Sequence, residues 1–199
     1  MTSTFTTEAP SGATPSEATA LIDRLSEWVV ELRNASSIAT GIIWGRSGMV
    51  LTNAHCIHDG EDPLIVTRLG TRRGRLLAVD GDRDLAAISV PGLAGPSLRI
   101  RDANALETGE LLFAYGHPRG VRDALSMGVL HAVARHRSGE PKFVVADLRL
   151  APGNSGGPLV DAKGQLVGIN HMIVNGLGVA IPATTAARFM DRVRVARAA

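Results

Sequence analysis

Short apolar runs broken by Gly, Pro and Asp fill most of the chain after Ile38. They recur at intervals of about 8–12 residues with no helical pattern between them, which predicts an all-β barrel or sandwich. The stretch 91–109 is rich in Pro, Gly and Ala, alternates little, and separates the runs into two groups. We therefore predict two β units, at about 38–92 and about 110–182, joined by a linker at 93–109.

Both ends of the chain instead show apolar residues at helical spacing. Near the N-terminus, Thr14 as N-cap with Glu17 three residues later has the pattern of a capping box. The apolar positions that follow are Leu21, Leu25, Trp28, Val29 and Leu32. These patterns predict an amphipathic helix within 14–34, after a flexible tail at 1–13, and a second helix at 184–198. The second helix has on one face Ala186, Phe189, Met190 and Val193.

The composition is that of a globular protein, with 45% hydrophobic and 20% charged residues among 199. The formal net charge is +2 and the charges are interspersed, so neither nucleic acid nor a membrane is an expected partner. Cys56 is the only cysteine, which excludes an internal disulfide and a cysteine-based metal site. The first residues lack the features of a secretory signal, so we expect a cytoplasmic protein. A periplasmic or secreted protein would require a leader that has been removed.

The stretch APGNSGGPLV, residues 151–160, places three glycines around Ser155. Glycine loses much backbone entropy on folding, so the loop is either a tight turn or a place where N–H groups approach a reacting atom. A nucleophilic serine needs a histidine base and a carboxylate that orients it. The candidate base is His55, which ends the apolar run VLTNAHC. The candidate acid is Asp84, directly before the run LAAISV.

Asp80 and Asp82 compete with Asp84 for the acid, but they lie in a sequence typical of an exposed turn. The order His55, Asp84, Ser155 is that of chymotrypsin, and differs from subtilisin and the α/β-hydrolases. The serine loop also matches the Gly-x-Ser-x-Gly elbow of the hydrolases. However, that elbow opens a helix, whereas here a proline and a strand-like run follow.

The segments TNAH, DLAAI, GNSGGPLV, LVGIN and GVAIP, in this order, resemble the trypsin-like serine proteases, most closely the HtrA/DegP type. The stretch YGHPRGVRDALSMGVL is also similar to that family. The resemblance covers about 38–190. It implies an all-β fold of two tandem antiparallel β-barrels of chymotrypsin type, within a protease domain at 35–199. The PDZ module common in HtrA proteins is not expected.

The resemblance also implies a serine endopeptidase that cleaves polypeptides and needs no cofactor or metal. His55 would act as general base and acid, Asp84 would orient it, and an acyl-enzyme would form on Ser155. The oxyanion hole would lie at the backbone of Gly153, Asn154 and Ser155. Relatives that need proteolytic activation have Asp at the position of Asn154, so we expect a site competent without N-terminal cleavage.

By the same resemblance, one pocket receives the side chain before the cleaved bond. No acidic residue lies at its base, near Arg149, so cleavage after Lys or Arg is not expected. We expect small or medium aliphatic side chains there instead. The residues implied in substrate binding are Leu150, His171, Met172, Ile173 and Leu177.

His171 departs from the family, which usually has Thr or Ser there. Three roles are open to it: a hydrogen bond to Asp84, restriction of the substrate pocket, or competition for the catalytic geometry. The first is favoured, and we expect His171→Thr to alter the pH–rate profile.

Two alternatives to the endopeptidase remain open. One is a catalytically idle pseudo-protease that binds peptides with its triad misaligned. The other is an esterase that uses the same triad. The N-terminal helix is a possible homo-oligomer contact.

Overall fold

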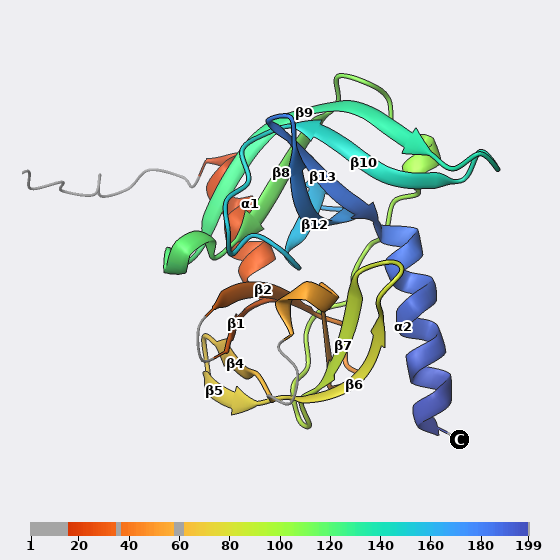
Figure 1. Ribbon diagram of the computed structural model, residues 1–199. Coiled ribbons are helices and arrows are strands. Elements are labelled where there is room, and N and C mark those ends of the chain that lie inside the picture. Colours follow the sequence, from red (N-terminus) through yellow and green to blue (C-terminus); the bar gives the residue numbers. More distant parts are fainter. Residues whose placement is uncertain (1–15, 35–36, 58–61, 199) are drawn as a thin grey trace, which may run out of the picture.

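The computed structural model describes residues 16–34, 37–57 and 62–198, which form two β-sheet units with two helices (Figure 1). The all-β prediction is confirmed. The predicted tail at 1–13 and the predicted N-cap Thr14 lie outside the described residues.

The first unit is a seven-stranded antiparallel sheet in the order β5-β4-β1-β2-β3-β7-β6. This sheet is the first of the two expected β-barrels and has the form of a half-barrel. Its strands are β1 (Val29–Arg33), β2 (Ile38–Ile43), β3 (Met49–Thr52), β4 (Leu64–Thr67), β5 (Gly70–Arg73), β6 (Arg75–Asp80) and β7 (Leu85–Ser89). The short helical turn η1 (Ala54–Cys56) follows β3.

The second unit is a closed barrel in the order β10-β13-β12-β11-β8-β9. Its strands are β8 (Leu111–Gly116), β9 (Ala124–Arg135), β10 (Pro141–Asp147), β11 (Pro158–Asp161), β12 (Leu166–Val174) and β13 (Leu177–Pro182). Two short helical turns precede β8 and β9, η2 (Ala103–Ala105) and η3 (Pro118–Gly120). The segment between the two units makes one parallel bridge to the barrel, Ile100 to Leu166.

The N-terminal helix is shorter than its sequence pattern predicts. Helix α1 (Glu17–Ser26) begins after Ser16, whose side chain accepts a hydrogen bond from the Thr19 N–H at 3.2 Å. The chain then continues as strand β1, so the expectation of a helix within 14–34 is wrong after Ser26.

The reason lies in the pairing of β1 on both of its edges. Val29 pairs with Ile42 of β2, and Leu32 pairs with Ile65 of β4. The strand is buried along most of its length, so apolar residues occur on both faces and coincide with helical spacing. Pairing with distant strands therefore overrides the local pattern.

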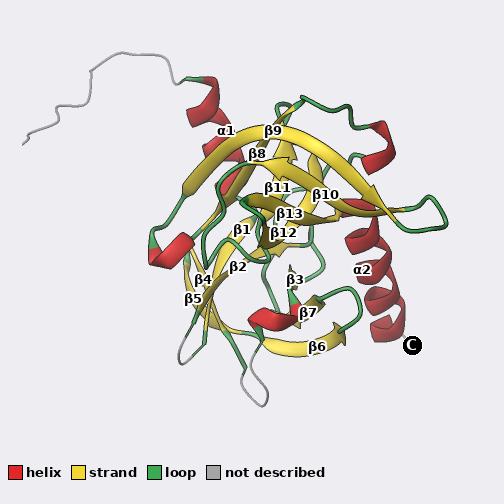
Figure 2. Ribbon diagram, turned by 45° about the horizontal axis from the view of Figure 1, so that its top comes forward, coloured by secondary structure: helices red, strands yellow, loops and turns green. Residues whose placement is uncertain are grey.

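Helix α2 (Ala183–Ala198) confirms the predicted C-terminal helix. The two helices lie toward opposite sides in both views (Figures 1 and 2). One apolar core joins them, with Leu21 and Leu25 of α1, Phe189 and Met190 of α2, and residues of both sheets. The apolar face of α1 therefore packs against its own chain. None of the described helices is long and apolar enough to cross a bilayer.

Candidate active site

His55 and Asp84 lie at the ends of neighbouring strands of the half-barrel. β3 and β7 are antiparallel, with Thr52 opposite Ala86, so the turn after β3 meets the turn before β7. The Asp84 carbonyl accepts from the Ala54 N–H at 3.2 Å and from the Asn53 side chain at 3.0 Å. Asp84 has a φ of 51°, a left-handed conformation that Asp adopts more readily than most residues. The sheet register therefore brings the predicted base and acid together.

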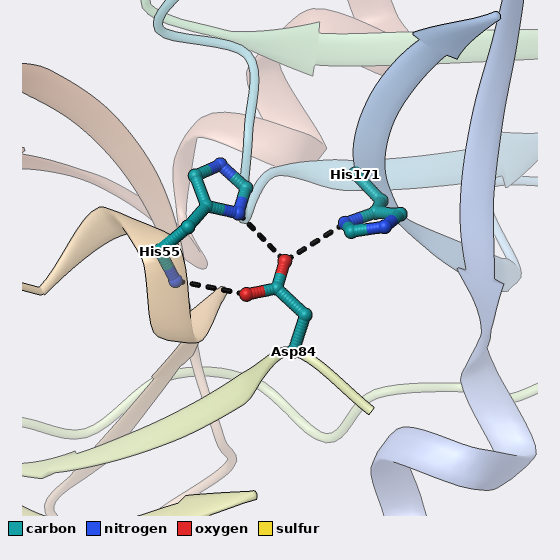
Figure 3. Close-up of side chains that lie close together, drawn as sticks. All are labelled: His55, Asp84 and His171. Atoms are coloured by element: carbon teal, nitrogen blue, oxygen red, sulfur yellow. Dashed lines mark hydrogen bonds and ion pairs between the residues drawn. The ribbon is translucent and has the colours of Figure 1, made fainter. Parts of the chain in front are cut away.

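The Asp84 carboxylate holds His55 at two points (Figure 3). Oδ1 accepts from the His55 backbone N–H at 2.8 Å, and Oδ2 lies 2.6 Å from the ring Nδ1. A carboxylate only accepts, so Nδ1 carries the proton in this contact. The hydrogen bond to Asp84 raises the pKa of His55 well above its ordinary value. Burial acts to raise the pKa of Asp84, but the close polar contacts of its carboxylate with His171 and His55 outweigh it and hold that pKa well below its usual range.

His171 of β12 approaches the same carboxylate oxygen from the other side. Its Nδ1 lies 2.8 Å from Asp84 Oδ2, and its side chain is only 11% exposed. This is a close polar contact, but within the described residues the buried Nδ1 has no well-aligned hydrogen bond. The ring stacks on Phe143 at 5.8 Å between centroids, with 12° between the planes. His171 thus lies against Asp84, while the expected hydrogen bond between the two stays a prediction.

The serine loop begins with a tight β-turn. The Asn154 N–H donates to the Ala151 carbonyl at 3.0 Å, with Pro152 and Gly153 at the central positions. Gly153 has a φ of 105°, the sign that a type II turn requires at this place. A Cβ there would lie 2.6 Å from the His117 carbonyl oxygen. The position therefore requires glycine for both its conformation and its space.

Every carbonyl from residue 152 to residue 155 accepts a hydrogen bond. Two of them are bound by Thr40 of β2, whose hydroxyl donates to the Gly153 carbonyl at 2.6 Å and whose N–H donates to the Ser155 carbonyl at 3.0 Å. The other two pairs are Arg119 N–H with the Pro152 carbonyl at 2.8 Å and Gly157 N–H with the Asn154 carbonyl at 3.0 Å. The loop is therefore fixed by backbone contacts across the two sheet units.

Two amides of this loop remain available. Within residues 16–34, 37–57 and 62–198, the N–H groups of Gly153 and Ser155 donate to no protein group. The Asn154 N–H is already donated to Ala151. We therefore do not retain the expectation that Asn154 supplies an oxyanion donor.

The Ser155 hydroxyl donates to the His171 carbonyl at 3.4 Å. Among the described hydrogen bonds, none joins Ser155 to His55. The structure thus brings the predicted base and acid into contact, with the serine turned toward β12.

A cavity of about 250 Å³ opens beside Ser155. Four of the five residues expected in substrate binding line it: Leu150, His171, Met172 and Ile173. Leu177 does not; it pairs with Val174 across β12 and β13. The cavity is completed by Ala151, Pro152, Asn154 and Ser155, so no charged carboxylate lines it.

His117 lies behind the serine loop and is 5% exposed. Its N–H donates to the Thr40 hydroxyl at 3.0 Å, and its ring Nδ1 accepts from the Asp123 N–H at 3.3 Å. Burial lowers the pKa of His117 below its ordinary value. The neutral ring is therefore the form that fits this place.

Sequence reasoning missed Thr40, Arg119 and Phe143. Thr40 lies inside an apolar run and reaches a carbonyl 113 residues away, so no local pattern marks it. Arg119 acts through its backbone, which its residue type does not reveal. The stacking of Phe143 on His171 depends on the placement of β10 and β12 on either side of β13.

Comparisons with known proteins relate this chain to serine proteases. The model of the trypsin-like peptidase domain matches residues 39–169. A probable periplasmic serine endoprotease, DegP-like, from Ectopseudomonas mendocina is 33% identical over 173 residues, covering 81% of this chain and 36% of the relative. The putative serine protease HhoB from Synechocystis is 34% identical, covering 74% of this chain and 38% of the relative. The chain thus spans somewhat over a third of these relatives.

Solved structures show the same likeness. The HtrA-type protease AlgW with a tripeptide superposes with a TM-score of 0.80 at 30% identity, covering 90% of this chain and 64% of the other. Together with the curated relatives, it supports the HtrA/DegP resemblance drawn from the sequence motifs.

The cytoplasmic expectation is contradicted by the DegP-like relatives, which are named periplasmic serine endoproteases. A single cysteine excludes an internal disulfide, but a protein without disulfides is equally compatible with an oxidising compartment. The resemblance of the motifs, the two-sheet fold and the matched family model agree. The chain belongs to the trypsin-like peptidase domain family.

Proposed function

We propose that this chain is a serine endopeptidase domain whose triad is His55, Asp84 and Ser155. The observation that carries the proposal is the two-point contact of Asp84 with His55, at 2.8 Å to the backbone N–H and 2.6 Å to Nδ1. This contact sets the ring orientation and places the proton on Nδ1, leaving Nε2 to accept one. The contact lies near the surface, with the His55 side chain 47% exposed.

The reaction begins when the Ser155 hydroxyl rotates away from the His171 carbonyl toward Nε2 of His55. Ser155 Oγ attacks the substrate carbonyl carbon while Nε2 takes its proton, and Asp84 stabilises the imidazolium that forms. The imidazolium then gives this proton to the leaving amine, and the acyl-enzyme remains on Ser155. Water repeats the sequence, with His55 as base, to release the acid and restore the hydroxyl.

The negative oxygen of the intermediate would be bound by the N–H groups of Gly153 and Ser155. The occupied carbonyls around them support this role, because a peptide unit held at its oxygen presents its N–H in a fixed direction. Donors fixed in advance need no reorganisation during the reaction.

Substrate would bind along β12 beyond Ile169. β11 pairs with β12 at residues 166–169, and no described strand continues this pairing along Met172–Val174, so on that side an extended peptide can pair with β12. The side chain before the cleaved bond would enter the cavity formed by Leu150, Met172 and Ile173. Its size and apolar walls favour small or medium aliphatic residues, with loose discrimination because one methylene contributes only about 1–3 kcal/mol. By likeness to relatives named periplasmic, we place this activity outside the cytoplasm.

A fluorophosphonate probe tests the nucleophile directly. We expect the intact chain to be labelled and Ser155→Ala to be unlabelled. A folded chain that takes no label would favour the idle peptide-binding alternative. If labelling occurs, turnover of matched ester and peptide substrates separates an esterase from an endopeptidase.

A further inference from the structure

The cluster of His55, Asp84 and His171 differs from a simple triad in having a second imidazole. Both Nδ1 atoms face one carboxylate oxygen, at 2.6 Å from His55 and 2.8 Å from His171 (Figure 3). The three potential ligand atoms all lie within 4.8 Å of one another. We propose that this cluster binds one Zn²⁺ or a similar transition-metal ion, which switches the proposed protease off reversibly.

The donor set fits this class of cation. Two imidazole nitrogens and one carboxylate oxygen suit Zn²⁺ and Co²⁺, whereas Ca²⁺ and Mg²⁺ prefer all-oxygen sites. In a tetrahedral zinc site with bonds of about 2.0–2.1 Å, neighbouring ligand atoms lie about 3.3 Å apart. The two distances from Nδ1 to Asp84 Oδ2, 2.6 and 2.8 Å, therefore need to lengthen only by a fraction of an ångström.

The surroundings of His171 support a ligand role. Its Nδ1 is buried, and within the described part of the chain it has no well-aligned hydrogen bond. A buried polar atom without a good partner is costly, and coordination would satisfy it. Stacking on Phe143 already fixes the ring plane, so the His171 side chain loses little conformational freedom when it binds the ion.

The ion has a path to the site and an effect on it. The side chain of His55 is 47% exposed, so one side of the cluster is open to solvent, where water would complete the coordination. Coordination requires both Nδ1 atoms without protons, and these protons pass to the buffer. The ion then occupies the nitrogen and the oxygen whose contact orients His55. Metal binding and catalysis are therefore mutually exclusive.

The experiment measures metal binding apart from activity. Zn²⁺ is titrated calorimetrically into the Ser155→Ala chain, purified without a histidine tag, and Co²⁺ is followed by its visible absorption. We expect one equivalent to bind, unaffected by a large excess of Mg²⁺. Adding His171→Ala should weaken binding at least tenfold. Adding His131→Ala should not, because that imidazole is exposed on β9, outside the cluster.

If His171→Ala fails to fold, His171→Thr is the second variant, checked by near-ultraviolet circular dichroism. Unchanged affinity in a folded His171 variant, or the lack of a saturable single equivalent, would overturn the inference. The inference rests on the proposed function only for its consequence, reversible inhibition that a chelator relieves. A chain that binds Zn²⁺ but has no hydrolytic activity would refute the proposed function alone. An active chain that does not bind Zn²⁺ would refute only this inference.

Discussion

The half-barrel and the closed barrel hold their parts of the candidate site by different means. In the half-barrel, the Asp84 carboxylate binds both the backbone N–H and the ring Nδ1 of His55. In the closed barrel, the loop around Ser155 is held at four consecutive carbonyls, three of them by backbone N–H groups. One part therefore depends on the chemistry of particular side chains, and the other on the path of the backbone.

Substitutions in the two regions should therefore have different effects. Changing the acid in the half-barrel removes a function while leaving the fold intact. In the barrel loop, the Ser155 hydroxyl, the glycine positions and the bonds that fix the peptide units are the features that substitution should disturb most. Three substitutions and one change of pH test this difference, and they follow from the largest expected effect to the smallest.

Asp84→Asn should have the largest effect, lowering kcat by about 10⁴-fold. The amide can present its NH₂ group to Nδ1, which favours the wrong tautomer of His55 while the geometry is kept. Steady-state kinetics with a peptide substrate measure the loss. A variant that keeps more than a tenth of the parent's kcat would show that Asp84 does not orient the base.

Gly153→Ala should lower kcat by about 10²–10³-fold, the loss typical of one oxyanion donor. The new Cβ would lie 2.6 Å from the His117 carbonyl oxygen, so the turn must shift. Gly109→Ala is the matched control, since it has a φ of 92° but no atom within 4 Å of an added Cβ. Equal kinetic losses in both variants would mean that backbone strain, and not the position of the loop, is responsible.

Thr40→Val should lower kcat about tenfold with little change in KM, because the oxyanion donors act mainly in the transition state. The substitution removes the hydroxyl that binds the Gly153 carbonyl and leaves that carbonyl buried, a cost of about 1–3 kcal/mol. Thr40→Ser restores the hydroxyl and should restore kcat. Failure of this rescue would assign Thr40 a packing role only.

The smallest expected effect is that of pH on stability: acid should lower the free energy of unfolding slightly through His117 in the closed barrel. Burial lowers the pKa of His117, so the unfolded chain binds more protons than the folded chain below the ordinary histidine pKa of about 6.5. This contribution to stability is present above that pH and is lost as the pH falls below it. His117→Asn should show a smaller difference than the parent between urea unfolding at pH 7.5 and pH 5.5. Identical pH dependence would exclude His117 as its source.

Much of the fold and several residues of the candidate site could be predicted, because short stretches of the sequence carry the patterns that indicate them. The residues of TNAH and DLAAI mark a strand end and a strand start, and the sheet register then brings His55 and Asp84 together. The glycines around Ser155 mark a special backbone path in the same way.

What sequence reasoning could not supply depends on contacts between distant segments. The end of α1 at Ser26 is set by the pairing of β1 with β2 and β4. The bond from Thr40 to Gly153 crosses between the two sheets, and the direction of Leu177 depends on the register of β12 and β13. None of these has a signature within a short window of residues.

The shared apolar core between the two helices has a consequence for how the molecule folds. It is the largest of the three buried clusters and draws on both sheets, with Leu51 and Leu85 from one and Val160 and Ile169 from the other. Neither sheet can lose its structure without exposing the interior of the other. The chain should therefore melt as one cooperative unit, in a single calorimetric transition. Base and nucleophile, although they belong to separate sheets, would then be gained and lost together.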